Sequence, residues 1–178
     1  IRDLVRSRGL GDVYKRQTER YYEEEGRAEL TPRDFGILMH RVFENAATTD
    51  EIYMAIEAMT QDGVLDEKEA PRLRELVEKA LADPVTAEWF GGRWQVVRNE
   101  NEIILPGSGT TRRPDRVMTD GERAVVVDYK FGDRETARHR KQIREYLRLL
   151  RQMGYTRTEG YLWYVRLGRT ERVEEKED

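Results

Sequence analysis

Apolar residues recur at helical spacing through the first half of the chain and at alternate positions through much of the second half. The helical spacing predicts amphipathic helices over residues 32–46, 49–61 and 66–82, and a later helix over residues 134–153. The alternating spacing predicts strands over residues 93–98, 102–105, 113–119, 124–131 and 161–167. This order indicates a helical N-terminal segment followed by a mixed sheet that is crossed by one helix.

Two of the predicted strands should form a tight hairpin. Asp120-Gly121, between them, is a strong short signal for such a turn. With these two residues as the loop, Asp115 pairs with Val126. Because side chains alternate between the faces of a sheet, Asp115 then shares a face with Val126, Asp128 and Lys130.

The two aspartates on this face suggest a metal site. In the predicted register Asp115 and Asp128 are diagonal neighbours, roughly 7–8 Å apart at the backbone. Two carboxylates on a face otherwise lined by valine repel each other unless a cation lies between them, and a divalent metal with oxygen ligands is the natural candidate. The alternative is that both are ordinary exposed residues near a turn. The run Val125–Val127, however, is typical of a buried central strand.

The amino-acid composition excludes several kinds of chemical site and bears on the cellular location of the protein. The 178 residues suffice for one domain with a sizeable core. The chain has no cysteine, which excludes thiolate zinc sites, iron–sulfur clusters, disulfides and a cysteine nucleophile, and is compatible with the reducing cytoplasm. No apolar run reaches the length of a membrane span. The net charge of −3 gives no information about a polyanionic partner, so the local distribution of charge must decide.

The chain divides into four parts. Residues 1–17 are predicted to be non-native, because Asp12–Gln17 looks like the translation of a sequencing adapter. The alternative is a genuine basic N-terminal arm. Residues 18–34 are expected to be a linker or lead-in helix, residues 35–169 the folded domain, and residues 170–178 a charged C-terminal tail.

Four motifs occur in order along the chain. They are Gly36-x-x-x-His40, Arg113-Pro114-Asp115-Arg116, Asp128-Tyr129-Lys130 and Gln142-x-x-x-Tyr146. Together they resemble the motif set of PD-(D/E)xK nucleases, and specifically the RecB/AddA-type nuclease domain at the C-terminus of UvrD/Rep-like helicases. The resemblance covers residues 35–167. It implies a restriction-endonuclease-like α/β fold, with a mixed central sheet flanked by helices and an added N-terminal helical segment.

The resemblance also implies a set of site residues. Mg²⁺ or Mn²⁺ would be bound by His40, Asp115, Asp128 and the backbone carbonyl of Tyr129, with Glu100 or Glu102 as a further candidate ligand. The implied catalytic residues are Asp115, Asp128, Lys130, Gln142 and Tyr146. Lys130 would orient or activate the attacking water; its alternative role is a salt bridge to one of the aspartates.

The predicted helix over residues 134–153 carries mostly positive charges, which favours a phosphate-contacting surface. We expect DNA contacts from Arg116, Arg138, Lys141 and Arg144. Tyr129 and Tyr146 could stack on bases, whereas Trp163 and Tyr164 are expected to pack in the core. The sequence contains no P-loop motif, so no nucleotide is expected to bind to this chain through one.

The implied activity is metal-dependent hydrolysis of DNA, with an exonuclease favoured over an endonuclease. The resemblance places such a domain at the end of a helicase–nuclease that acts in double-strand break repair and recombination. Its partners would be single-stranded DNA ends, covalently attached upstream helicase domains and a second helicase–nuclease subunit. The alternatives are a catalytically inactive DNA-binding or assembly module and a free-standing nuclease with no helicase partner. Polarity, strand preference and oligomeric state stay open.

Overall fold

The computed structural model describes residues 32–104, 111–132 and 136–174. The predicted non-native segment and residues 18–31 of the predicted linker or lead-in helix therefore lie outside the described residues, whereas residues 32–34 belong to the first described helix. None of the described helices combines the length and the apolar character that crossing a membrane requires.

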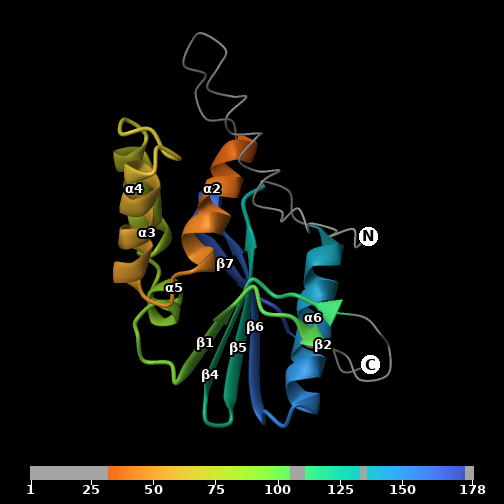
Figure 1. Cartoon of the computed structure of the whole chain (residues 1–178). Helices are drawn as coiled ribbons and strands as arrows, with labels where there is room; N and C mark the ends of the chain where they lie inside the picture. The colour runs from red at the N-terminus through yellow and green to blue at the C-terminus, as the bar shows by residue number, and fades with distance from the viewer. Residues whose placement is uncertain (1–31, 105–110, 133–135, 175–178) are drawn as a thin grey trace, which may run out of the picture.

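The first half of the described chain is helical, as the apolar spacing predicts. Its helices are α2 (Pro32–Glu44), α3 (Thr49–Gln61), α4 (Ala70–Ala80) and α5 (Pro84–Trp89). Thr48 and Glu51 form a capping box that begins α3, and prolines occupy the first turns of α4 and α5, where a missing N–H costs nothing. These helices lie together on one side of the sheet (Figure 1).

The sheet contains five strands in the order β1-β4-β5-β6-β7. The strands are β1 (Val96–Asn99), β4 (Arg116–Asp120), β5 (Arg123–Lys130), β6 (Arg157–Tyr164) and β7 (Arg169–Arg172). β5 and β6 are parallel and are connected through α6 (Ala137–Gln152), whereas the other neighbouring strands are antiparallel. A separate two-stranded sheet is formed by β2 (Ile103–Ile104) and β3 (Thr111–Arg112), and a short 3₁₀ helix, η1 (Val165–Leu167), follows β6.

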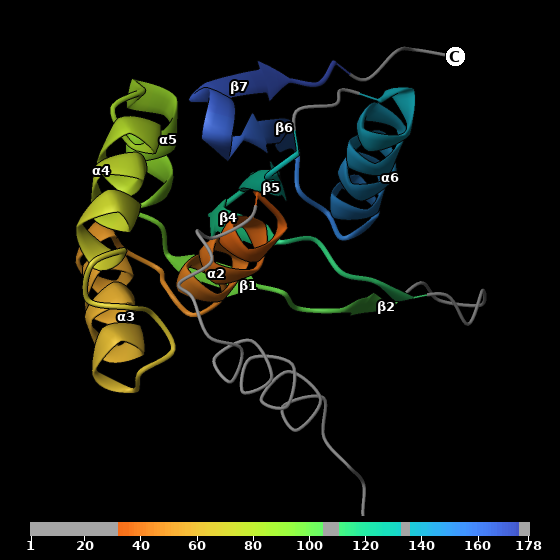
Figure 2. The same ribbon diagram turned by 90° about the horizontal axis from the view of Figure 1, so that it is seen from above.

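Alternation along β5 divides the core into two layers. Val125, Val127 and Tyr129 pack with residues of α2, α3, α4 and α5. Ala124 and Val126 pack with residues of α6 on the opposite face. Figure 2 shows the sheet between these two layers of helices. The predicted fold class, a mixed sheet flanked by helices, is confirmed.

The contact between α6 and β6 is especially close at Gly160. A Cβ atom built at this position would lie 2.4 Å from Cγ2 of Ile143. Glycine therefore lets the helix approach the strand more closely than any other residue would allow.

The hairpin between β4 and β5 differs from its predicted register. Asp120 pairs with Arg123, so Gly121 and Glu122 form the loop, with Gly121 at a φ of 56°. Continued past Arg116 and Val127, this register places Asp115 opposite Asp128 rather than diagonal to it. The partner of Asp115 therefore changes from Val126 to Asp128. Because this is a shift by an even number of residues, both aspartates stay on the predicted face of the sheet.

Several predicted boundaries are wrong. The third helix begins at Ala70 rather than at residue 66, and of the strand predicted over 113–119 only residues 116–119 are in a strand, β4. The strand predicted over 161–167 is instead β6, from Arg157 to Tyr164, followed by η1. Residues 170–173 belong to the folded domain and not to the predicted C-terminal tail, because β7 pairs with β6 and Val173 is buried, with its N–H bonded to the carbonyl of Gly160.

Candidate functional site

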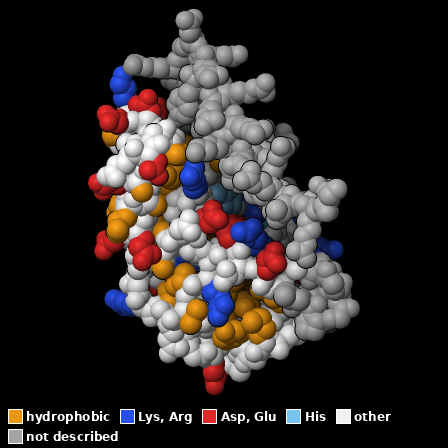
Figure 3. Space-filling view, viewed as in Figure 1, with side chains coloured by type: hydrophobic (Ala, Val, Ile, Leu, Met, Phe, Trp, Pro, Cys, Tyr) orange, Lys and Arg blue, Asp and Glu red, His pale blue; other side chains and the backbone are white. Residues whose placement is uncertain are grey.

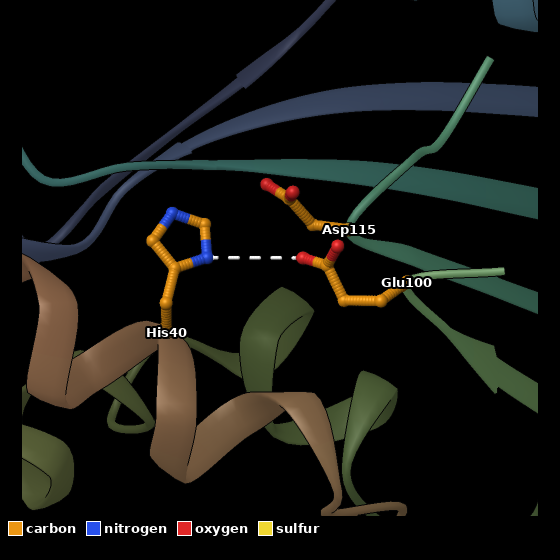
Figure 4. Close-up of side chains that lie close together, drawn as sticks. All are labelled: His40, Glu100 and Asp115. Carbon is orange, nitrogen blue, oxygen red and sulfur yellow. Dashed lines mark ion pairs between the residues drawn. The ribbon is translucent and has the colours of Figure 1, made fainter. Parts of the chain in front are cut away.

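Three side chains with metal-binding atoms converge at one end of the sheet. His40 comes from α2, Glu100 follows β1, and Asp115 immediately precedes β4 (Figure 4). One ligand atom from each of the three lies within 4.8 Å of the others. An imidazole nitrogen and two carboxylate oxygens at this spacing fit a divalent cation.

The backbone brings the two carboxylates together. The N–H of Glu100 donates to the carbonyl of Asp115 at 3.0 Å, directly beyond the last pair between β1 and β4, Asn99 with Arg116. Glu100 has a φ of 52°, a left-handed backbone conformation that is uncommon for a residue with a side chain. Such conformations persist where the surrounding structure holds them, and they are concentrated at functional sites.

The electrostatics of the cluster favour a bound cation or proton. Burial, the charge of Asp128 and that of Glu100 raise the pKa of Asp115 to about 8, although the N–H of Tyr129 donates to its carboxylate. Burial also raises the pKa of Glu100, against the opposing charge of Arg113. Burial lowers the pKa of His40, so its imidazole is held in the neutral form that binds metals.

His40 is held by aromatic packing and by proximity to Glu100. Its Nδ1 lies 3.9 Å from Oε1 of Glu100, and its ring meets that of Phe131 edge to face, at a centroid distance of 4.6 Å. The same side chain also lies close to Gly36, because a Cβ built at Gly36 would lie 3.2 Å from Cβ of Phe131. Glycine at this position therefore lets Phe131 pack beside α2.

Asp128 lies nearby in a more enclosed position. It is 2% exposed; its Oδ2 forms an ion pair with Lys130, and its Oδ1 accepts a hydrogen bond from Nε2 of Gln142 at 3.2 Å. The same amide of Gln142 lies 2.8 Å from the hydroxyl of Tyr146. The structure thus brings four of the predicted catalytic residues together, from β5 and from the facing side of α6, in contact with one another.

The two candidate acidic ligands before β2, Glu100 and Glu102, lie in different positions relative to the cluster. Glu100 belongs to the cluster, whereas Glu102 is exposed and is not part of it. Asp128 is not among the three clustered residues either, but its charge contributes to the raised pKa of Asp115.

The prediction that Tyr129 and Tyr146 stack on bases is wrong. Both side chains are buried, at 3% and 1% exposure, and the Tyr129 ring packs against Phe43 and Trp163. Trp163 and Tyr164 are core residues, as expected.

The predicted DNA contact by Arg116 is also wrong. Its side chain is completely buried, and its guanidinium donates to the carbonyls of Ala46, Ala47 and Trp89. A side chain in this position cannot reach a strand of DNA.

The other predicted DNA contacts lie on α6. Arg138 and Lys141 are exposed, and Arg144 is half-buried, with its Nε donating to the carbonyl of Glu174. Two ion pairs join α6 to neighbouring strands. Arg140 pairs with Glu171 of β7, and Arg112 of β3 pairs with Glu145.

Two other groups at the site are not among the residues that the sequence predicts for it. Arg113 lies 3.0 Å from a carboxylate oxygen of Glu100. His139 is one helical turn before Gln142; burial and the charge of Lys130 lower its pKa, and its Nδ1 is enclosed. For His139 the available signal was its spacing of three residues from Gln142. Figure 3 shows acidic and basic side chains gathered around a recessed histidine on this face.

Comparison with known families agrees with this geometry. The PD-(D/E)XK nuclease superfamily matches the chain over residues 13–178. No curated protein matches it significantly. On the extent of the family match, the chain belongs to the PD-(D/E)XK nuclease superfamily.

Proposed function

We propose that this chain is a metal-dependent deoxyribonuclease domain that hydrolyses phosphodiester bonds. The observation that carries the proposal is the convergence of His40, Glu100 and Asp115, whose ligand atoms lie within 4.8 Å of one another beside Asp128 and Lys130. Membership of a nuclease superfamily supports the same reaction class.

Mg²⁺ or Mn²⁺ would be held by His40, Glu100 and Asp115, with Asp128 and the backbone carbonyl of Tyr129 as further ligands. When bound, such a cation polarises a phosphate and lowers the pKa of water. The raised pKa values of Asp115 and Glu100 support this assignment, since burial disfavours the negative charge of both carboxylates and a bound cation would compensate it.

Lys130 would position the attacking water and offset negative charge on the phosphate. Its ammonium is held close to the site by Asp128. Gln142, hydrogen-bonded to both Asp128 and Tyr146, would fix the orientation of the Asp128 carboxylate. These residues therefore act in different ways, with Lys130 at the reacting atoms and Gln142 through Asp128.

Exposed cations of α6 would hold the DNA backbone. Arg138 and Lys141 lie on the same helix as Gln142 and Tyr146, within its first two turns, so a bound strand would pass close to Asp128. We propose cleavage from single-stranded ends, fed by helicase domains on the same polypeptide and by a second helicase–nuclease subunit, during double-strand break repair and recombination. These finer assignments rest on the motif resemblance.

The direct test is DNA digestion by the wild-type protein, Asp128→Ala and Lys130→Ala, with Mg²⁺ or Mn²⁺. We expect the wild type to cleave labelled single strands, and both variants to lose at least ~100-fold in rate. A linear and a circular substrate separate exonuclease from endonuclease action. Equal and negligible cleavage by all three proteins would reject the nuclease assignment and leave a DNA-binding or assembly module.

A further inference from the structure

Two neighbouring residue pairs divide their side chains between the site and the core. Glu100 and Asp115 contribute to the metal-binding cluster. The residues beside them, Asn99 and Arg116, pair with each other across β1 and β4, and their side chains reach the segment after α2 and the end of α5. Because neighbouring side chains along a strand point to opposite faces, the two carboxylates of the cluster are directly adjacent in the chain to two residues that contact the helices.

Both side chains hold the chain segment that directly follows α2. The carbonyl of Ala46 accepts from Nη1 of Arg116 at 2.7 Å and from Nδ2 of Asn99 at 3.0 Å. Nη1 of Arg116 also lies 3.1 Å from Oδ1 of Asn99, and Nη2 donates to the carbonyl of Ala47 at 2.8 Å. We call Asn99, Arg116 and the carbonyls of Ala46 and Ala47 the α2 clamp.

The α2 clamp extends to a second helix. Nη2 of Arg116 donates to the carbonyl of Trp89, the last residue of α5, at 2.7 Å. The guanidinium carbon lies 4.0 Å from the centroid of the Phe90 ring. The carbonyl of Trp89 ends a helix and lacks a partner within it, and those of Ala46 and Ala47 lie in the link between α2 and α3, so one fork-shaped guanidinium donates to all three.

A completely buried guanidinium is an expensive way to join helices to a sheet. Burial lowers the pKa of Arg116, and the oxygens that accept its hydrogen bonds belong to neutral groups. Apolar side chains often stabilise a core as well or better, so a buried charge suggests a requirement for a defined geometry. The geometry fixed here is that between α2, which carries His40, and the strand ends that carry Glu100 and Asp115.

We propose that Arg116 and Asn99 are positioning residues that set the separation of His40 from Glu100 and Asp115, and thereby the metal affinity of the site. The inference rests on the proposed function, because it requires these three residues to bind a metal. Arg116 and Asn99 touch neither metal nor DNA, and they act through the backbone that follows α2.

The test is a double-mutant cycle in which Mn²⁺ affinity is measured by calorimetry. Arg116→Lys keeps the charge but loses the fork of donors, and it should weaken Mn²⁺ binding about 10-fold, as substitutions behind metal ligands commonly do. In a His40→Ala background the same substitution should change the affinity by less than about twofold, because the ligand it positions is gone. Asn99→Ala should follow the same pattern with a smaller effect, and it serves if Arg116→Lys does not fold.

Val125→Ala is the matched control, since Val125 is fully buried in the same core layer and lies outside the α2 clamp. It should lower the melting temperature and leave Mn²⁺ affinity unchanged. A purely structural role for Arg116 predicts the same behaviour for Arg116→Lys, or an equal loss with and without His40, and either result would overturn the inference while the nuclease assignment stands. Failure of the wild-type protein to bind Mn²⁺ would instead overturn the proposed metal site and the inference with it.

Discussion

The ammonium group of Lys130 forms an ion pair with the buried carboxylate of Asp128, two residues before it on β5. The same carboxylate is a proposed metal ligand, so the lysine and a cation would compete for it. A lysine that served only to neutralise Asp128 would become dispensable once a metal is bound, whereas a lysine that acts on water or phosphate would not.

Replacing Lys130 with methionine separates these two roles. We expect Lys130→Met to reduce the cleavage rate by ~100-fold or more, because the group that positions the water is lost. Mn²⁺ affinity should stay equal or rise, because a competing cation has been removed from Asp128. Single-turnover cleavage and calorimetry measure the two quantities. Loss of Mn²⁺ binding, with cleavage restored at saturating metal, would mean that Lys130 only supports the metal site.

Glu100 and Glu102 provide a matched pair of substitutions. Glu100 lies in the cluster with His40 and Asp115, whereas Glu102 is exposed outside it. Glu100→Ala should weaken Mn²⁺ binding by about tenfold or more, as expected for the loss of a ligand worth at least ~1.4 kcal/mol. Glu102→Ala should bind and cleave as the wild type does. The reverse ranking in calorimetry would show that the backbone conformation of Glu100 serves another purpose.

Metal binding should depend on pH through Asp115. Its pKa is raised to about 8, so a cation must displace a proton over most of the range below that pH. We expect the apparent Mn²⁺ affinity to rise by up to about tenfold per unit between pH 6 and pH 8 and then to level off. Calorimetry in buffers of different ionisation enthalpy counts the protons released. A flat affinity profile with no proton release would contradict the raised pKa.

The same raised pKa affects stability without metal. The unfolded chain loses the Asp115 proton at its ordinary pKa of 3.8, whereas the folded protein holds it to about 8. The contribution of this group is therefore fully present below the lower value and is lost as the pH rises through the upper one. Asp115→Asn should lessen the fall in melting temperature between pH 6 and pH 9, measured with a chelator present.

The contact between α6 and β6 can be tested through stability alone. In Gly160→Ala the new methyl group would meet Ile143, which lies 2.4 Å from the position of the Cβ. We expect a loss of ~1–3 kcal/mol in the free energy of unfolding, as is typical of overpacked cores. Ile143→Ala, combined with Gly160→Ala, should recover part of that loss relative to the sum of the single changes. Strict additivity in urea titrations would show that the helix moves away instead.

The sequence predicted the arrangement of layers because it depends on apolar spacing, which is strong in both halves of the chain. It also assigned Asp115 and Asp128 to one face despite an incorrect hairpin register. The pairing moved by an even number of residues, and alternation is insensitive to such a shift. Local patterns therefore sufficed for the fold class and for the faces of the strands.

The errors arose where distant segments decide the outcome. Arg116 looks like a surface cation in sequence, but it is buried because carbonyls that follow α2 and end α5 require donors. Glu100 is distinguished from Glu102 by its positive φ, which no spacing reveals. β7 looks like a charged tail because it is an edge strand, and its assignment depends on pairing with β6.

The central claim is that His40, Glu100 and Asp115 bind a divalent metal beside Asp128 and Lys130. A crystal structure with Mn²⁺, with anomalous diffraction recorded, tests it most directly. We predict one strong anomalous peak with Asp115 and at least one of the other two residues as direct ligands, at the ~2.0–2.2 Å expected for oxygen and nitrogen donors. At millimolar Mn²⁺, no peak within the cluster, or a peak only at exposed carboxylates elsewhere, would contradict it.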